Sequence, residues 1–520
     1  MWRLTMNKKN KAVVFNMIAN ILSFGVSMII SFFLTPYITK TVGTEAYGLV
    51  GLANSFINYI NIITAALNSM ASRFIIIELH KKDTDKANTY FSSVLIANTI
   101  FAFIILIPAV WLIANIDILN ISFNLLWDAK ITFAIIFINF VISLLGAFFG
   151  IVLYAKNLLW KGSFRTLESN ILRVLLIFVF FTIFSGKIYF VVLATFITGL
   201  YCIGFNIYYT KKYTPELKVS RRFFSLKAIK TLISAGIWNS VTKLSQILLD
   251  GLDLLLSNLF INGIMTGNVS IAKTIPSLYT SVVALLSDSF YPEFLEYYSK
   301  GMKEELMKSI KKSINVLSAI SGICLSMLII YAKDFYYLWL PDNNAILLQR
   351  LTIISTGTVL ISGCIYSLYS IFSLTNQVKK NSIALLVTGI LSIITTFFCL
   401  RYTNLGIYAI VGISSLYGII RNLTFTPIYA AKCLKIGTFT FYPVILKNLL
   451  NIGVLMLVDM GVKQLIPPSS WGMLIVNGII DLLIGSLITL LVMFNKEQRK
   501  QIFDKIARIQ KRRSDESGSK

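Results

Sequence analysis

The hydropathy pattern constrains the fold of this chain more than any other feature. About fourteen apolar stretches, each long enough to cross a bilayer, fill it from Ala12 to Asn495. A helix needs roughly 20 mostly apolar residues to span ~30 Å of hydrocarbon. With only 14% charged residues among 520, the chain cannot form a soluble globular protein. Its function must therefore be performed inside the membrane.

The predicted fold class is an all-α polytopic membrane protein, in which charged residues separate the helices. The first apolar run follows a basic segment but is too long for a signal peptide, so we expect a retained helix. The predicted spans are roughly 12–34, 46–67, 89–113, 131–153, 164–184, 188–209, 230–258, 268–291, 313–333, 350–374, 382–400, 405–430, 443–464 and 473–494.

The basic residues indicate the orientation of these helices. If the amino terminus is cytoplasmic, about 36 of the 48 Lys and Arg residues fall in inside segments and about 7 in outside segments. We therefore expect both termini in the cytoplasm and the protein in a bacterial cytoplasmic membrane. The net charge of +25 then lies in loops beside anionic lipid headgroups, which argues against nucleic acid binding.

A weak internal repeat divides the chain. A shift of 220 residues places Gly43 on Gly263 and Asn68 on Asp288. Six helices followed by six in the same orientation are typical of a parallel repeat with its axis along the membrane normal. The predicted domains are a six-helix lobe at 1–211, a cytoplasmic linker at 212–229, a second six-helix lobe at 230–436, two additional helices at 437–495 and a basic tail at 496–520.

Four helices at matched positions of the repeat carry polar residues along one face. These residues are Asn16, Asn20, Ser23, Ser27 and Ser31 in the first helix, Tyr47, Asn54, Asn58, Asn61 and Asn68 in the second, Asn239, Thr242, Lys243, Gln246, Asp250 and Asp253 in the seventh, and Ser270, Lys273, Ser277, Asp288 and Tyr291 in the eighth. We expect the four faces to line one water-accessible cavity. Helix packing through hydrogen bonds is the alternative, and for the first helix both interpretations stay open.

The seventh helix carries charges that require water or partners. In a span, each buried charge costs roughly 2.5 to 3.5 kcal/mol, whereas each Leu or Ile returns only ~0.3 to 0.6 kcal/mol. Lys243, Asp250 and Asp253 must therefore face one another or water, and Lys273 is a candidate ion-pair partner. Two more intramembrane cations, Arg173 and Arg421, could face the cavity or extend to the cytoplasmic surface.

The sequence disfavours metal and triad chemistry. His80 is the single histidine, and the five cysteines are far apart, so neither a Ser-His-Asp triad on another histidine nor a zinc spacing is present. No outside loop is long enough to house the paired carboxylates of a membrane glycosyltransferase or polymerase. We expect a transporter that is not an enzyme and has no cofactor, with H⁺ or Na⁺ coupling left open.

The spans, the repeat and the segment TPYITKTVGTEAYGLVGLANSFINYI, with Pro36, Gly43, Ala46, Tyr47 and Gly48, resemble the polysaccharide flippase family. That family belongs to the multidrug/oligosaccharidyl-lipid/polysaccharide (MOP, MATE-like) superfamily. The resemblance implies two six-helix lobes in a V around a central cavity, with two extra helices. It also implies alternating access that carries an undecaprenyl-diphosphate-linked oligosaccharide, a capsule, O-antigen or teichoic-type precursor, to the outer leaflet.

The resemblance gives the polar residues expected roles. The amides of the stripes would bind sugar hydroxyls, and Lys243, Lys273, Arg173 and Arg421 would bind the diphosphate. Asp250, Asp253 and Asp288 are the candidates for ion coupling or ion pairing. The expected partners are the lipid-linked oligosaccharide, membrane lipids, and the glycosyltransferases and polymerase of the same pathway.

The absence of acidic residues from the first helix makes other substrates less favoured. The drug exporters of the superfamily typically place an acidic residue there, and this chain has no Asp or Glu between Met1 and Thr44. A peptidoglycan-precursor flippase is the second alternative, a drug or cation antiporter the third, and a membrane glycosyltransferase or polymerase the last.

Overall fold

The computed structural model of the chain describes residues 8–494, 496, 499 and 500, and the regular elements in that part are all helices. The predicted all-α fold class is confirmed. In chain order the elements are α1 (Lys8–Val42), α2 (Thr44–His80), α3 (Thr84–Ala114), η1 (Ile116–Ile118), η2 (Phe123–Leu125), α4 (Leu126–Gly146), η3 (Ala147–Gly150), α5 (Ile151–Ala155), α6 (Leu159–Ile183), α7 (Ile188–Tyr213), η4 (Arg221–Phe223), α8 (Leu226–Gln246), η5 (Ile247–Gly251), α9 (Asp253–Phe260), α10 (Gly263–Asp288), α11 (Tyr291–Ser299), α12 (Lys303–Trp339), α13 (Ala345–Leu374), α14 (Val378–Tyr402), α15 (Ile407–Leu423), α16 (Phe425–Leu434), α17 (Tyr442–Leu465) and α18 (Trp471–Met493).

Among the described residues, 13 helices are long and apolar enough to cross a membrane. Each overlaps one of the predicted spans. The remaining prediction, 230–258, corresponds to three shorter elements, α8, the π-helix η5 and α9. The charges at Lys243, Asp250 and Asp253 lower the hydropathy of this segment, and the π-helix divides it, so it lies outside the set of 13.

The described residues form two compact units. Unit 1 comprises the chain up to Ile271 together with Leu385–Ile410, and unit 2 comprises Ala272–Ala384 together with the chain from Val411. The boundary crosses α10, α14 and α15. The predicted lobe boundaries stay a prediction.

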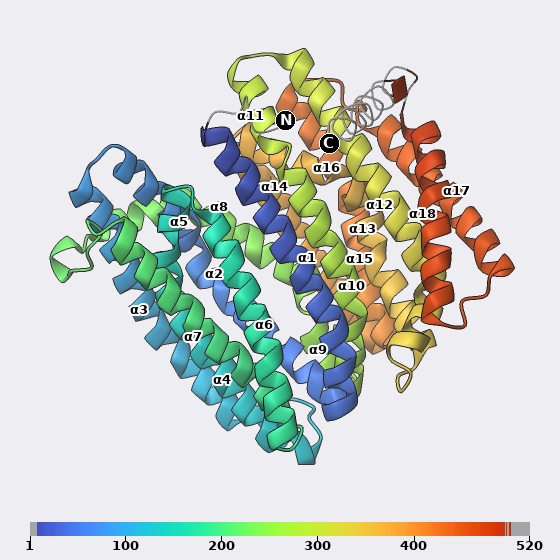
Figure 1. Cartoon of the computed structure of the whole chain (residues 1–520), viewed down its shortest axis with the longest axis horizontal. Coiled ribbons are helices and arrows are strands. Elements are labelled where there is room, and N and C mark those ends of the chain that lie inside the picture. Colours follow the sequence, from blue (N-terminus) through green and yellow to red (C-terminus); the bar gives the residue numbers. More distant parts are fainter. Residues whose placement is uncertain (1–7, 495, 497–498, 501–520) are drawn as a thin grey trace, which may run out of the picture. The chain divides into compact units, whose positions relative to one another are not determined.

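The first six long helices of unit 1 form a closed bundle. Following neighbours around it, α1 packs on α6, α6 on α7, α7 on α4, α4 on α3, α3 on α2, and α2 on α1. Figure 1 shows α3, α4, α7 and α6 side by side. Leu52, Leu67 and Phe133 are fully buried among these helices. Alanine and glycine then let a seventh helix, α8, pack along α2.

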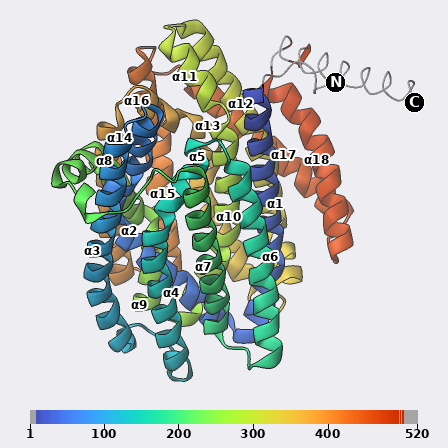
Figure 2. The ribbon, with the colours of Figure 1, turned by 60° about the vertical axis from the view of Figure 1, so that its left-hand side comes forward.

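Unit 2 is organised around α12, which packs against α13, α17 and α18. One hydrophobic cluster of this unit includes Phe294, Ile310, Ile365, Phe372 and Phe441. The last two helices, α17 and α18, pack against each other as well as against α12, and Figure 2 shows them side by side. Although the three helices are long and apolar, polar side chains are buried among them, including those of Asn448, Asp459 and Asp481.

Candidate functional site

Exposed polar side chains lie on three neighbouring helices of unit 1. Asn20 lies on α1, Asn54 and Asn58 on α2, and Lys243 and Gln246 on α8, and the side chains of all five are exposed. The helices are neighbours, since α2 packs against both α1 and α8. Polar side chains exposed on membrane-spanning helices usually face water or a substrate path, because hydrocarbon cannot solvate them. We call these five residues the polar face.

Glycine and small residues fix how α2 and α8 carry this face. A Cβ at Gly236 would lie 2.0 Å from the main-chain oxygen of Ala66, so the two backbones meet there without a side chain between them. The Ser240 hydroxyl donates to the main-chain oxygen of Ile62 at 2.8 Å. These contacts set the register of Lys243 and Gln246 against the asparagines of α2.

The acidic end of the seventh predicted span does not lie on one face. The π-helix η5 contains Asp250, which is exposed, and Asp253 follows it on α9, where it is 3% exposed. Both residues take part in polar or electrostatic interactions. The Tyr59 hydroxyl donates to the main-chain oxygen of Gly251 at 2.9 Å and so binds α2 to the π-helix. An α-helical projection places these two acids together, and the extra residue of the π turn separates them.

Some predicted cavity residues hold helices together. The Asn16 amide donates to Asn157 Oδ1 at 2.7 Å and accepts from the main-chain N–H of Trp160 at 2.9 Å, so it anchors the start of α6. The Asn239 amide donates to Ser69 Oγ at 3.0 Å, between α8 and α2. Asn61 is half-buried on α2. For Asn16, these contacts are the packing role that the sequence left open.

The predicted cations lie in different surroundings. In unit 1, Arg173 is half-buried on α6, and its Nε atom is buried with no hydrogen-bond partner among the described residues. In unit 2, Lys273 is half-buried on α10 and takes part in polar or electrostatic interactions. Asp288 is exposed at the end of α10.

Arg421 is held by its own unit. It is 8% exposed on α15, and its guanidinium donates to Asn381 Oδ1 at 2.6 Å. The guanidinium carbon lies 5.6 Å from the centre of the Tyr369 ring, and Tyr369 donates to Asn422 at 2.7 Å. The sequence showed an isolated intramembrane cation, and these partners come from two other helices, α13 and α14.

The structure also contains a basic cluster that was not predicted from the sequence. Lys161, at the start of α6, donates to the Tyr213 hydroxyl at 2.6 Å, and its ammonium lies 4.8 Å from the Tyr209 ring and 5.2 Å from that of Trp160. Arg165, one turn further along, donates to Asn206. The i,i+4 spacing of Tyr209 and Tyr213 could have indicated an aromatic surface on α7, but its pairing with α6 is a tertiary contact.

The chain also matches a known family. Residues 13–298, more than half of the chain, match the family described as "Polysaccharide biosynthesis protein". The chain belongs to this family. The family predicted from the sequence is confirmed. Over 488 residues, 94% of this chain and 96% of the relative, it is 27% identical to the "Uncharacterized membrane protein EpsK" of Bacillus subtilis (strain 168).

Two solved structures illustrate the fold of this polysaccharide biosynthesis protein. The "Lipid II flippase MurJ" in an inward closed conformation is 18% identical, with a TM-score of 0.65 over 92% of this chain and 99% of that one. An inward-facing multidrug resistance MATE family transporter of the MOP superfamily is 15% identical, with a TM-score of 0.62 over 82% and 99%. The chain is therefore a multi-pass membrane protein with the fold of the MOP superfamily.

Proposed function

We propose that this polysaccharide biosynthesis protein is a flippase that moves an undecaprenyl-diphosphate-linked oligosaccharide across the bacterial cytoplasmic membrane by alternating access. The observation that carries this proposal is the polar face of α1, α2 and α8. Asparagine and glutamine side chains offer both donors and acceptors to sugar hydroxyls. Lys243, exposed on α8, adds a compact positive charge, which suits a diphosphate.

The proposed transport needs no covalent chemistry. The substrate would enter and leave unchanged, so the protein would act as a transporter and not as an enzyme. Glycosyltransferases would supply the lipid-linked oligosaccharide and a polymerase would use it, which makes them the expected pathway partners. An H⁺ or Na⁺ gradient would drive the cycle, with Asp250, Asp253 and Asp288 as the coupling candidates.

Purified protein in liposomes tests this function. The liposomes would contain an undecaprenyl-diphosphate oligosaccharide with a fluorescent sugar, and a membrane-impermeant reductant would quench the label in the outer leaflet. With wild-type protein, the quenched fraction of the fluorescence should exceed the half that belongs to the outer leaflet. With Lys243→Ala it should stay at that half. Lys230→Ala is the matched control, because Lys230 is exposed near the start of the same helix.

A peptidoglycan precursor is the second candidate substrate, and the MurJ-like fold favours it as much as the first. The same liposomes with fluorescent lipid II distinguish the two. Transfer of lipid II alone would overturn the oligosaccharide assignment, and transfer of neither lipid by the wild-type protein would overturn the flippase assignment.

A further inference from the structure

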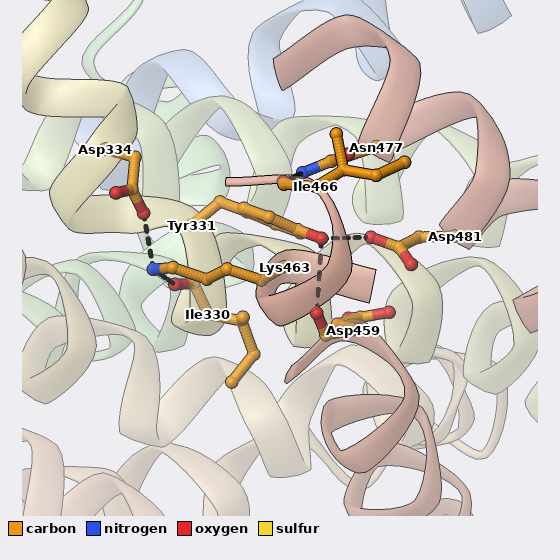
Figure 3. A network of polar contacts seen from close by, with 8 residues as sticks. All are labelled: Ile330, Tyr331, Asp334, Asp459, Lys463, Ile466, Asn477 and Asp481. Carbon is orange, nitrogen blue, oxygen red and sulfur yellow. Dashed lines mark hydrogen bonds and ion pairs between the residues drawn. The ribbon is translucent and has the colours of Figure 1, made fainter. Parts of the chain in front are cut away.

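Two buried carboxyl groups meet inside the α12, α17 and α18 group of unit 2. Asp459 of α17 and Asp481 of α18 are each 1% exposed. Their side chains interact with each other, and Figure 3 shows both carboxyl groups near the hydroxyl end of Tyr331. We call these two residues the carboxyl pair. No residue of the polar face in unit 1 belongs to it.

The Tyr331 hydroxyl of α12 contacts both members of the carboxyl pair. Its oxygen lies 2.7 Å from Asp481 Oδ2 and 3.2 Å from the main-chain oxygen of Asp459. A tyrosine hydroxyl has one hydrogen to donate, whereas here it faces two acceptors. The hydrogen goes to Asp481 Oδ2, the nearer acceptor, and so satisfies only one carboxyl oxygen of the pair.

Two further carboxyl oxygens of the pair favour a shared proton. Asp459 Oδ2 and Asp481 Oδ1 are buried and accept no hydrogen bond from a donor among the described residues. Two ionised carboxylates would present only lone pairs and like charges to each other. A single proton between them turns that repulsion into a hydrogen bond, as expected when two carboxyl groups share a site.

The nearby positive charge is already engaged. Lys463 lies one turn after Asp459 on α17, but its ammonium forms an ion pair with Asp334 of α12 and donates to the main-chain oxygen of Ile330 at 2.9 Å. Among the described residues, no ion pair therefore provides the carboxyl pair with a positive charge. A buried carboxylate without a counter-ion is strongly disfavoured, and protonation removes the charge.

The titratable groups around the pair are few. Tyr331 of α12 contacts the pair, whereas Asp334 of α12 and the ammonium of Lys463 lie together away from the Tyr331 hydroxyl. Helix α18 adds the neutral Asn477, which donates to the main-chain oxygen of Ile466 at 2.7 Å. Helix α13, which also packs against α17, has no Asp, Glu, Lys or Arg after Arg350. Besides the two carboxyl groups themselves, their burial and the Ser326 hydroxyl of α12 therefore influence the protonation of the pair.

We propose that Asp459 and Asp481 form a proton-binding site that holds at least one proton at neutral pH, and that loss of this proton loosens the packing of α17 and α18 on α12. The ligand is a proton from solvent, and no bond other than the O–H bond forms or breaks. This site lies outside the coupling candidates of the proposed function and does not depend on them.

Infrared spectroscopy of the full chain in lipid nanodiscs tests the proposal. The wild-type spectrum at neutral pH should contain the carbonyl band of a protonated carboxyl group, and the band should disappear as the pH is raised. Asp459→Asn combined with Asp481→Asn should remove the band at every pH, since an amide resembles the protonated acid in shape. Asp342→Asn, an exposed acid of the same unit, should leave it.

Thermal unfolding gives a second measurement that does not need transport activity. The wild-type melting temperature should fall as the pH rises through deprotonation of the pair, because the folded state binds the proton more tightly than the unfolded state. The double variant should lose that part of the pH dependence. Identical spectra and identical pH profiles for wild type and double variant would overturn the proposal. So would loss of the band at constant neutral pH on addition of Na⁺, which would identify a sodium site.

Discussion

Gly236 of α8 lies directly against the main-chain oxygen of Ala66 of α2, which an added Cβ would approach to 2.0 Å. Because that neighbour is backbone, it cannot move aside as a flexible side chain would. Gly236→Ala should therefore separate α2 from α8 and cost about 1–3 kcal/mol of stability. Melting temperature and membrane protein level are the measurements. Gly204→Ala is the control, because a Cβ there meets no atom within 4 Å; equal effects of both substitutions would contradict the close-packing argument.

The polar face should be accessible to water. Single cysteines at Asn58 and Gln246, in a background without the native five cysteines, should react with small hydrophilic thiol reagents. Cysteines at Ile63 and Ile237, apolar positions that are also exposed on α2 and α8, should react much more slowly if they face lipid. Similar rates at all four positions would mean that the polar residues do not mark a water-filled space.

The orientation of the helices can be tested directly. Cysteines replacing Arg221 and Asp342, both exposed outside the long helices, should differ in labelling by an impermeant thiol reagent in intact cells. The charge distribution predicts that only the cysteine at Asp342 reacts, since Arg221 belongs to the basic, inside set. Labelling only at Arg221 would reverse the topology.

Lys243 is the residue on which the proposed substrate contact depends most. Lys243→Ala should abolish export at a normal protein level, and Lys243→Arg should keep part of it because the charge survives. If Lys243 instead only neutralises Asp250, removing both side chains should restore export. Export and membrane protein level, scored separately for the single and double variants, decide between the two roles.

Arg421 should affect folding whether or not it contacts substrate. Arg421→Met removes the hydrogen bond to Asn381 and the contact with the Tyr369 ring, and hydrogen bonds to charged groups contribute about 1.5–3 kcal/mol. We expect a lower melting temperature for Arg421→Met and a smaller decrease for Asn381→Ala. An unchanged melting temperature in Arg421→Met would show that these contacts do not stabilise unit 2.

Much of the helical plan could be predicted from hydropathy and charge, because a membrane span is a local property of about 20 residues. The seventh span shows the limit: periodicity assumed α-helical geometry throughout, whereas the π-helix at Ile247–Gly251 changes which residues share a face. Contacts between helices that are distant in the sequence could be predicted even less. Asn16 pairs with Asn157, and Asp459 with Asp481, through packing that no spacing within one helix reveals. Both acids were visible inside apolar spans, and that signal alone could have marked them.

The π-helix between α8 and α9 would allow α9 to rotate about the helix axis while the backbone stays helical. A π turn contains one residue more than an α turn, and closing it to α geometry would rotate the residues of α9 by about 100° around the helix axis. Asp253, which is now buried, would turn relative to Lys243, while the backbone on either side stayed helical. The segment from α8 to α9 thus carries one extra residue, and moving the π turn along it would exchange buried and exposed polar groups in a single discrete step.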